Sequence, residues 1–247
     1  TNSRSRTCGA PMSDFVCRIK DYIQPFEREL AFQEVGTLLQ NLGLKAEKKS
    51  QAELTVFGSE EHISTFVQRL AYWESVEGQG HSITTLQSLR EATVNVVRNG
   101  IDLDVLRGSL PFGDEVSLPN RRCLRYGTHG IHEYRGKFFP QLVRALINVS
   151  GTGAGGIVAD PMSGSGTTLV ESKLFGCESF GVDMTPLSCL LTETKAGLLE
   201  ANPDELVDGY RAIREALLKP EPRSQKMAYF ESLPKDDQRY LSAWFGT

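Results

Sequence analysis

The 247-residue sequence lacks several features that would define its class at once. No apolar run approaches the ~18 residues of a membrane span, and this absence argues against a membrane-spanning helix. Arg4 and Arg6 near the start are not followed by an apolar core, so no secretory signal is predicted. The five cysteines show no Cys-x-x-Cys spacing and no paired framework, which predicts reduced thiols and a cytoplasmic protein.

Two kinds of ligand find little support in the composition. The formal net charge of -4 offers no overall attraction to nucleic acid, so any such binding must come from a local patch. His129 and His132 are three residues apart, but no further ligand follows at a suitable spacing, and no metal site is predicted.

The first third of the chain predicts a small α+β domain. Residues 1–13 are polar, contain Gly9 and Pro11, and are interpreted as a disordered lead. Alternation and helical spacing then predict a strand, a helix, two strands, a second helix and a short strand, in the order of a ferredoxin-like unit over residues 14–80. The expected elements are a strand at 15–20, a helix from Pro25 to Gly43, a hairpin at 44–49 and 53–57, a helix from Ser59 with Trp73 on its face, and a strand at 75–79.

The remaining chain is predicted to form a linker and a second domain. Residues 81–120 predict one amphipathic helix, at 83–98, and then a linker rich in turn residues. Residues 121–247 predict an α/β domain that ends in further helices. One of these starts at Asn202-Pro203 with a capping-box pattern. Helical spacing predicts a buried stripe on it, composed of Leu206, Val207, Tyr210, Ile213 and Leu217.

The most informative stretch runs from Gly156 to Glu171. An apolar run ending at Asp160 predicts a buried strand, a turn with Gly164 and Gly166 follows, and an apolar-periodic helix ends at Gly176. Glycines let the backbone adopt positive φ and let a ligand approach closely. The first N–H groups of the helix would face the same crevice, at the carboxyl edge of a parallel sheet where α/β proteins bind ligands.

A second acid follows this turn at the distance seen in nucleotide-binding folds. Residues 179–183 predict another strand, which ends on Asp183. An acid about 20 residues beyond a glycine-rich turn hydrogen-bonds ribose hydroxyls in dinucleotide folds. Asp160 and Asp183 at neighbouring strand ends therefore predict a ligand of the adenosine type. The turn is not Gly-x-Gly-x-x-Gly, which argues against a nicotinamide oxidoreductase.

Three ordered blocks of this region resemble a known family. The sequence Asp-Pro-Met-Ser-Gly-Ser-Gly-Thr-Thr at 160–168 resembles motif I of the amino-group (adenine-N6 or cytosine-N4) DNA methyltransferases, which bind S-adenosylmethionine. Residues 129–142 look like the segment that precedes this motif and lines the methionine end of the cofactor, and residues 181–187 are similar to the family's acidic strand end. The resemblance covers residues 128–199 and implies a partial Rossmann-like methyltransferase sheet.

The resemblance implies a set of candidate cofactor residues. They are His132, Tyr134, Lys137, Phe138, Pro140, Asp160, Pro161, Ser163, Gly164, Ser165, Gly166, Thr167, Thr168, Asp183 and Met184.

A basic cluster precedes the motif. Between residues 121 and 144 there are six cations and one acid, Glu133, with tyrosine and phenylalanine rings between them that can stack on bases. These features predict contacts to DNA phosphates, although a solvated face beside a core aromatic cluster is the alternative. The candidate nucleic-acid residues are Arg121, Arg122, Arg125 and Arg135.

The catalytic block of the resembling family is not found. That block is an acid, asparagine or serine followed by Pro-Pro and an aromatic residue, and the closest matches at 117–120 and 232–235 lack the second proline and the ring. The catalytic residues are therefore unknown, and we expect the chain alone to transfer no methyl group. The block is expected beyond Thr247, and the alternative is a degenerate relative that binds the cofactor without catalysis. The partners expected besides DNA are the remaining C-terminal part of the enzyme or a restriction or defence protein.

Three functions stay open. The first is site-specific methylation of DNA in restriction–modification. An RNA (tRNA guanine-N2) methyltransferase is the first alternative, because those enzymes share a similar Asp-Pro-x-x-Gly-Ser-Gly-Thr loop and often carry an α+β domain in front. A non-catalytic methyltransferase-like scaffold is the second.

Overall fold

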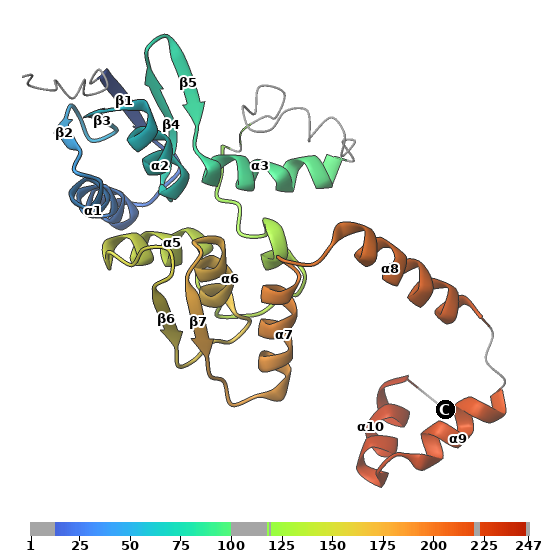
Figure 1. Cartoon of the computed structure of the whole chain (residues 1–247). Helices are drawn as coiled ribbons and strands as arrows, with labels where there is room; N and C mark the ends of the chain where they lie inside the picture. Colours follow the sequence, from blue (N-terminus) through green and yellow to red (C-terminus); the bar gives the residue numbers. More distant parts are fainter. Residues whose placement is uncertain (1–12, 100–117, 119, 220–222, 246–247) are drawn as a thin grey trace, which may run out of the picture. The chain divides into compact units, whose positions relative to one another are not determined.

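The computed structural model describes residues 13–99, 118, 120–219 and 223–245 (Figure 1). The chain divides into two compact units, residues 1–200 and 201–247. The lead predicted at 1–13 falls outside the described residues except for Ser13, and so does the linker region at 100–117. In its described part, the first unit contains one sheet of five strands and one of two, so the molecule is of mixed α/β class.

The first sheet is antiparallel, with the strand order β2-β3-β1-β4-β5. The predicted strand at 15–20, the hairpin at 44–57 and the strand at 75–79 are confirmed. The strand at residues 81–84 differs from the prediction, which places Ile83 in a helix; Ile83 instead pairs with Val76. The turn between this strand and the preceding one is formed by Gln79 and Gly80, both at positive φ. Gln-Gly is a weaker turn signal than Asn-Gly, so the sequence does not reveal this hairpin. The strands are β1 (Ser13–Ile19), β2 (Lys45–Lys48), β3 (Glu53–Gly58), β4 (Trp73–Gly78) and β5 (His81–Thr84).

Three helices accompany this sheet: α1 (Pro25–Leu42), α2 (Glu60–Arg69) and α3 (Leu86–Asn99). Helix α1 begins at Pro25, with the Gln24 N–H donating to the Glu27 carboxylate, and ends where Gly43 takes the left-handed conformation at φ 64°. Trp73 was predicted on the second helix, but that helix ends at Arg69 and Trp73 opens β4.

The core of this region is apolar and fully closed. Residues from β1, β3, β4, α1 and α2 contribute to it, and Trp73, completely buried, meets Phe32 edge to face at 5.5 Å. Other core members with no exposed surface are Cys17, Ala31, Val56, Ile63, Phe66, Leu70, Ala71 and Val76, and Ala145 from residues 140–149.

The second sheet consists of two parallel strands, β6 (Ile157–Asp160) and β7 (Glu178–Gly181), joined by α6 (Thr167–Leu174). The strand–turn–helix–strand order is therefore confirmed. The burial predicted for the first strand is wrong, because its residues are exposed or half-buried and Ile157 is 65% exposed. The register pairs Asp160 with Gly181, so both strands end at the same edge. A short helical turn, η1 (Gly127–Gly130), and the helices α5 (Pro140–Val149) and α7 (Pro186–Gly197) complete the surroundings of this sheet (Figure 1).

The described residues of the second unit form three helices: α8 (Pro203–Leu218), α9 (Arg223–Ser232) and α10 (Lys235–Phe245). The buried stripe expected on α8 is wrong. Helical periodicity identifies an apolar face but does not supply a partner for it, and no residue of α8 is buried in the described structure. The five stripe residues are between 44% and 80% exposed: Leu206, Val207, Tyr210, Ile213 and Leu217.

Candidate functional site

The site is built around the loop of residues 161–166, here called the glycine loop, between β6 and α6. Gly164 and Gly166 have φ of 51° and 78°, which the missing Cβ permits. The Ser163 N–H donates to the Val182 carbonyl at 3.0 Å, and the Gly166 N–H donates to the Ser163 carbonyl at 2.7 Å. The loop is therefore fixed against the strand end that follows β7.

The two predicted acids lie at adjoining strand ends. The Val182 N–H donates to the Asp160 carbonyl at 2.9 Å, and the Asp160 carboxylate accepts the Met162 N–H at 3.0 Å. The Asp183 carboxylate accepts the Gly164 N–H at 2.9 Å and both the N–H and the hydroxyl of Thr185 at 3.0 Å. Hydrogen bonds from Thr185 and Gly164 lower the pKa of Asp183. Asp183 therefore holds the glycine loop in place as a carboxylate.

Tyr134 brings the upstream block to the same place. A Cβ added to Gly164 would lie 3.1 Å from the Tyr134 ring, so the ring covers the loop backbone closely. The Tyr134 hydroxyl lies 3.3 Å from the Ser188 hydroxyl at the start of α7. A Cβ on Gly166 would come within 2.9 Å of the Thr192 backbone, so α7 also packs tightly on the loop.

The other candidate residues divide into buried and exposed groups. Ser163, Ser165 and Thr167 are buried, and the Ser165 hydroxyl has no hydrogen-bond partner among the described residues. Lys137 donates from Nζ to the His129 carbonyl at 3.2 Å. A cavity of about 360 Å³ beside β6 includes Phe138 and Thr168. Pro140 is buried at the start of α5, whereas His132, Phe138, Pro161, Met162 and Met184 are exposed.

The residues that hold this site together were missed in the sequence. Glu171, in the middle of α6, is completely buried and accepts hydrogen bonds from Tyr126, His129 and Arg144. Burial by itself raises the pKa of Glu171, but the Arg144 charge and the two other donors outweigh it and bring the pKa to about 2. A charged residue inside an apolar-periodic helix was the available signal.

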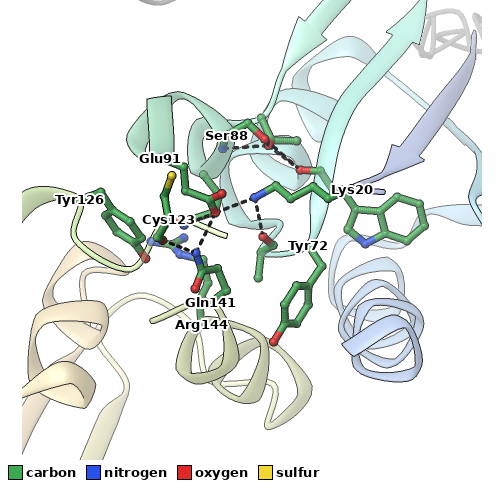
Figure 2. A network of polar contacts seen from close by, with 12 residues as sticks. Lys20, Tyr72, Ser88, Glu91, Cys123, Tyr126, Gln141 and Arg144 are labelled. Atoms are coloured by element: carbon green, nitrogen blue, oxygen red, sulfur yellow. Dashed lines mark hydrogen bonds and ion pairs between the residues drawn. The ribbon is translucent and has the colours of Figure 1, made fainter. Parts of the chain in front are cut away.

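Helix α5 connects this site to the first sheet. Its polar residues Gln141, Arg144 and Asn148 are spaced by three and four, so they share a face. Gln141 Nε2 donates to Glu91 at 3.1 Å, and Lys20 Nζ donates to the same carboxylate at 2.7 Å (Figure 2).

At the other end of α5, Asn148 Nδ2 donates to Glu34 of α1 at 2.8 Å. The Ala71 and Tyr72 N–H groups also donate to the Glu34 carboxylate. Polar side chains along α5 therefore reach buried carboxylates of α1, α3 and α6.

The basic cluster is smaller than its sequence indicates. Arg144 and the interleaved Tyr126 are buried rather than presented to solvent, which corrects the inferred surface. Arg122 pairs with Glu27 and stacks over Phe139 at 4.5 Å, and Arg125 pairs with Glu133. Arg121 and Arg135 are exposed. A cavity of about 950 Å³ is lined by residues 121–127 together with Thr93, Val94, Gly130 and Ile131.

Among the described residues, no group of three or more His, Cys, Asp or Glu side chains converges in a way that would hold a metal ion. No helix in this part of the chain has both the length and the apolar character needed to cross a membrane.

Comparison with known proteins assigns the same segment to methyltransferases. Residues 132–202 match the family model of the RMKL-like methyltransferase domain. The chain is 48% identical over 67 residues to the type II methyltransferase M.MjaII of Methanocaldococcus jannaschii, covering 27% of this chain and 12% of that protein. It is 33% identical over 108 residues to the type II methyltransferase M.BsoBI of Geobacillus stearothermophilus, covering 41% and 21%.

An RNA enzyme also matches. The tRNA (guanine(10)-N2)-dimethyltransferase of Methanothermobacter thermautotrophicus is 39% identical over 51 residues, which are 21% of this chain and 15% of that protein. The chain thus spans between 12% and 21% of the length of these relatives. Residues 132–202 thus match a methyltransferase domain, and the resemblance to the amino-group DNA methyltransferases is confirmed.

Proposed function

We propose that this chain carries the cofactor-binding part of a DNA methyltransferase that methylates adenine N6 or cytosine N4. The observation that carries the proposal is the contact of the Asp183 carboxylate with the Gly164 N–H, beneath the Tyr134 ring. This contact joins three sequence blocks into one polar site at the carboxyl edge of parallel strands. Similarity to two type II methyltransferases supports DNA as the substrate.

The residues of the site suit S-adenosylmethionine. Asp183 accepts three hydrogen bonds, and a carboxylate has about four acceptor positions, so capacity for a ribose hydroxyl remains. The unpaired hydroxyl of Ser165 is a further polar group in the loop. The two glycines let the loop adopt positive φ and pack closely under Tyr134 and α7. The bound cofactor would supply an electrophilic methyl group, and the protein would orient it toward the target base.

A partial Rossmann-like sheet is part of the proposal. Parallel sheets are normally covered on both faces, and two strands are too few for a stable sheet. Ile157 and Phe180 on these strands are 65% and 61% exposed. We propose that further strands of the whole enzyme extend this sheet, that further helices cover these side chains, and that the added part carries the acceptor–Pro–Pro–aromatic block that this chain lacks. For residues 14–80, the helix and strand order supports a ferredoxin-like unit.

DNA would approach from the side of residues 121–135. Arg121, Arg125 and Arg135 are exposed there. Arg121 and Arg135 would meet phosphates first, because Arg125 is paired with Glu133. Arg122 and Arg125 line the larger cavity while paired with Glu27 and Glu133, so they would contribute less charge. A target base in duplex DNA must leave the stack before its amino group can react.

Cofactor affinity tests the proposal. Titration calorimetry of the chain with S-adenosylhomocysteine is expected to show binding, and Asp183→Ala is expected to weaken it by about 10- to 100-fold, the range of a lost charged hydrogen bond. Asp21→Ala serves as the control, because it removes an exposed carboxylate that is far in sequence from Asp183 and the glycine loop. If the wild-type chain does not bind, the methyltransferase-like scaffold is the better description.

The tRNA relative favours RNA guanine N2 as a second candidate substrate. Methyl transfer by the full-length protein to duplex DNA and to tRNA, with labelled cofactor, separates the two. Label incorporated only into tRNA would contradict the DNA proposal and leave the cofactor site unaffected.

A further inference from the structure

Glu171 occupies an unusual place beside the proposed cofactor site. Its carboxylate is completely buried in α6, the helix that begins directly after the glycine loop. Oε1 accepts from the Tyr126 hydroxyl at 2.7 Å and from His129 Nε2 at 2.9 Å, while Oε2 accepts from Arg144 Nε at 3.0 Å. A carboxylate can only accept, so Nε2 of His129 carries a proton in this arrangement.

The three donors bracket the residues that face the glycine loop. Tyr126 and His129 precede residues 131–138, here called the pre-motif segment, and Arg144 follows them on α5. Within this segment, Lys137 donates back to the His129 carbonyl at 3.2 Å, and Tyr134 covers Gly164. One carboxylate therefore fixes both ends of the segment to the helix that carries the loop.

Ring contacts and burial surround the hydrogen bonds of Glu171. The centroids of the Tyr126 and His129 rings lie 5.1 Å apart, in edge-to-face geometry. The Arg144 guanidinium stacks at 4.3 Å over the ring of Phe175, the C-cap residue of α6. Arg144 and His129 are each 2% exposed. Removing the Glu171 charge would leave the Arg144 cation buried without its partner, which the fold tolerates poorly.

We infer that Glu171 is a positioning residue for the cofactor site, acting through Tyr126, His129 and Arg144 to hold the pre-motif segment against the glycine loop. This inference rests on the proposed function. Glu171 is buried beneath the site, so its effect passes through the segment rather than through contact with the ligand.

The test separates positioning from plain stabilisation. The dissociation constant for S-adenosylhomocysteine is measured by calorimetry. The temperature is chosen so that urea titrations show every variant to be fully folded in the absence of urea. Glu171→Gln keeps the shape of the side chain and removes its charge, and we expect binding to weaken by about 10- to 100-fold. We also expect the amides of residues 131–138 to exchange hydrogen faster in the ligand-free variant.

Two further variants keep the test decisive. Tyr126→Phe removes one donor and retains the ring, and we expect it to weaken binding of S-adenosylhomocysteine by about 3- to 10-fold. In the double variant with Glu171→Gln, we expect binding to be no weaker than in Glu171→Gln alone. Tyr126→Phe carries the test alone if Glu171→Gln does not fold. Glu200→Gln is the matched control, because it removes an exposed ion pair with Lys173 on the same helix, and binding should not change.

The outcomes distinguish this inference from the function on which it rests. Wild-type binding together with an unchanged dissociation constant in folded Glu171→Gln and Tyr126→Phe would overturn the positioning role and leave the cofactor site standing. Absence of binding by the wild-type chain would overturn both.

Discussion

The two sheets of the first unit differ in how completely they bury their apolar side chains. In the core of the antiparallel sheet and its helices, Val56 of β3 and Phe66 of α2 have no exposed surface. On the parallel pair, Phe180 is 61% exposed, and Val182 just after β7 is 66% exposed. The core of the first sheet is thus closed by its own helices together with Ala145 of α5, whereas the second sheet leaves apolar surface that other polypeptide would normally cover.

The two regions therefore differ in role: the antiparallel region supplies the apolar core, and the segment with the glycine loop carries the candidate site. The antiparallel region has its own core, and buried polar contacts of α5 tie the methyltransferase segment to it through Glu34 and Glu91. The segment with the glycine loop relies on that attachment, because two parallel strands bury too little surface by themselves. We therefore expect the first sheet to support the second in the chain as it stands.

Truncating one phenylalanine in each region gives the largest expected contrast. Phe66→Ala removes a fully buried ring and should lower the free energy of unfolding by about 3–5 kcal/mol. Phe180→Ala removes a mostly exposed ring and should change it by less than about 0.5 kcal/mol. Urea titrations measure both. An equal loss of stability in the two variants would show that the face of β7 is covered in solution. It would contradict the difference in burial between the two sheets.

Two buried carboxylates should give opposite pH dependences. Burial raises the pKa of Glu34 to about 7, so Glu34 binds a proton in the folded chain that it releases on unfolding at pH 5–7. Its stabilising contribution is complete below pH 4.5 and is lost as pH rises to 7, by about 3 kcal/mol. Glu171, with its pKa lowered to about 2, instead loses its contribution as pH falls from 4.5.

The Glu34→Gln variant tests this. Unfolding free energies measured from pH 5 to 8 should decline in the wild-type chain and stay flatter in the variant. Parallel curves for the two proteins would show that Glu34 is ionised throughout, and the junction of α1 with α5 would then be more polar than its burial indicates.

Two glycines at nearly the same φ measure how tightly the glycine loop is packed. Alanine at Gly155, with open space around its Cβ, should cost about 1 kcal/mol for the positive φ alone. Alanine at Gly166 meets the Thr192 backbone as well, and we expect a cost of about 3 kcal/mol and weaker binding of S-adenosylhomocysteine. Equal costs would mean that α7 yields, so that the loop is less fixed than its contacts suggest.

The smallest effect is expected at the surface of the antiparallel sheet. Arg18 Nε contacts Glu77 at 3.0 Å, with both side chains about half exposed. Glu77→Gln should change the free energy of unfolding by less than about 1 kcal/mol, and raising the salt concentration should remove that difference. A larger, salt-independent loss would contradict the view that apolar burial accounts for the stability of this region.

The sequence by itself determined the local elements and the motif. Alternation, helical spacing and Gly43 predicted most of the first sheet and its helices, and the two acids fell at neighbouring strand ends because parallel strands finish at one edge. Those signals depend on residues a few positions apart, and such spacings do not change when the rest of the chain folds.

Only the tertiary structure decided which polar and apolar groups meet. Glu171 lies 45 positions from Tyr126, and Arg122 lies 95 from Glu27, so no local pattern connects them. The same holds for coverage: periodicity placed an apolar stripe on α8, but burial requires a partner surface that periodicity cannot specify. Long-range packing therefore decided the hydrogen-bond network beneath the glycine loop, whereas the loop itself was already evident from the amino-acid sequence.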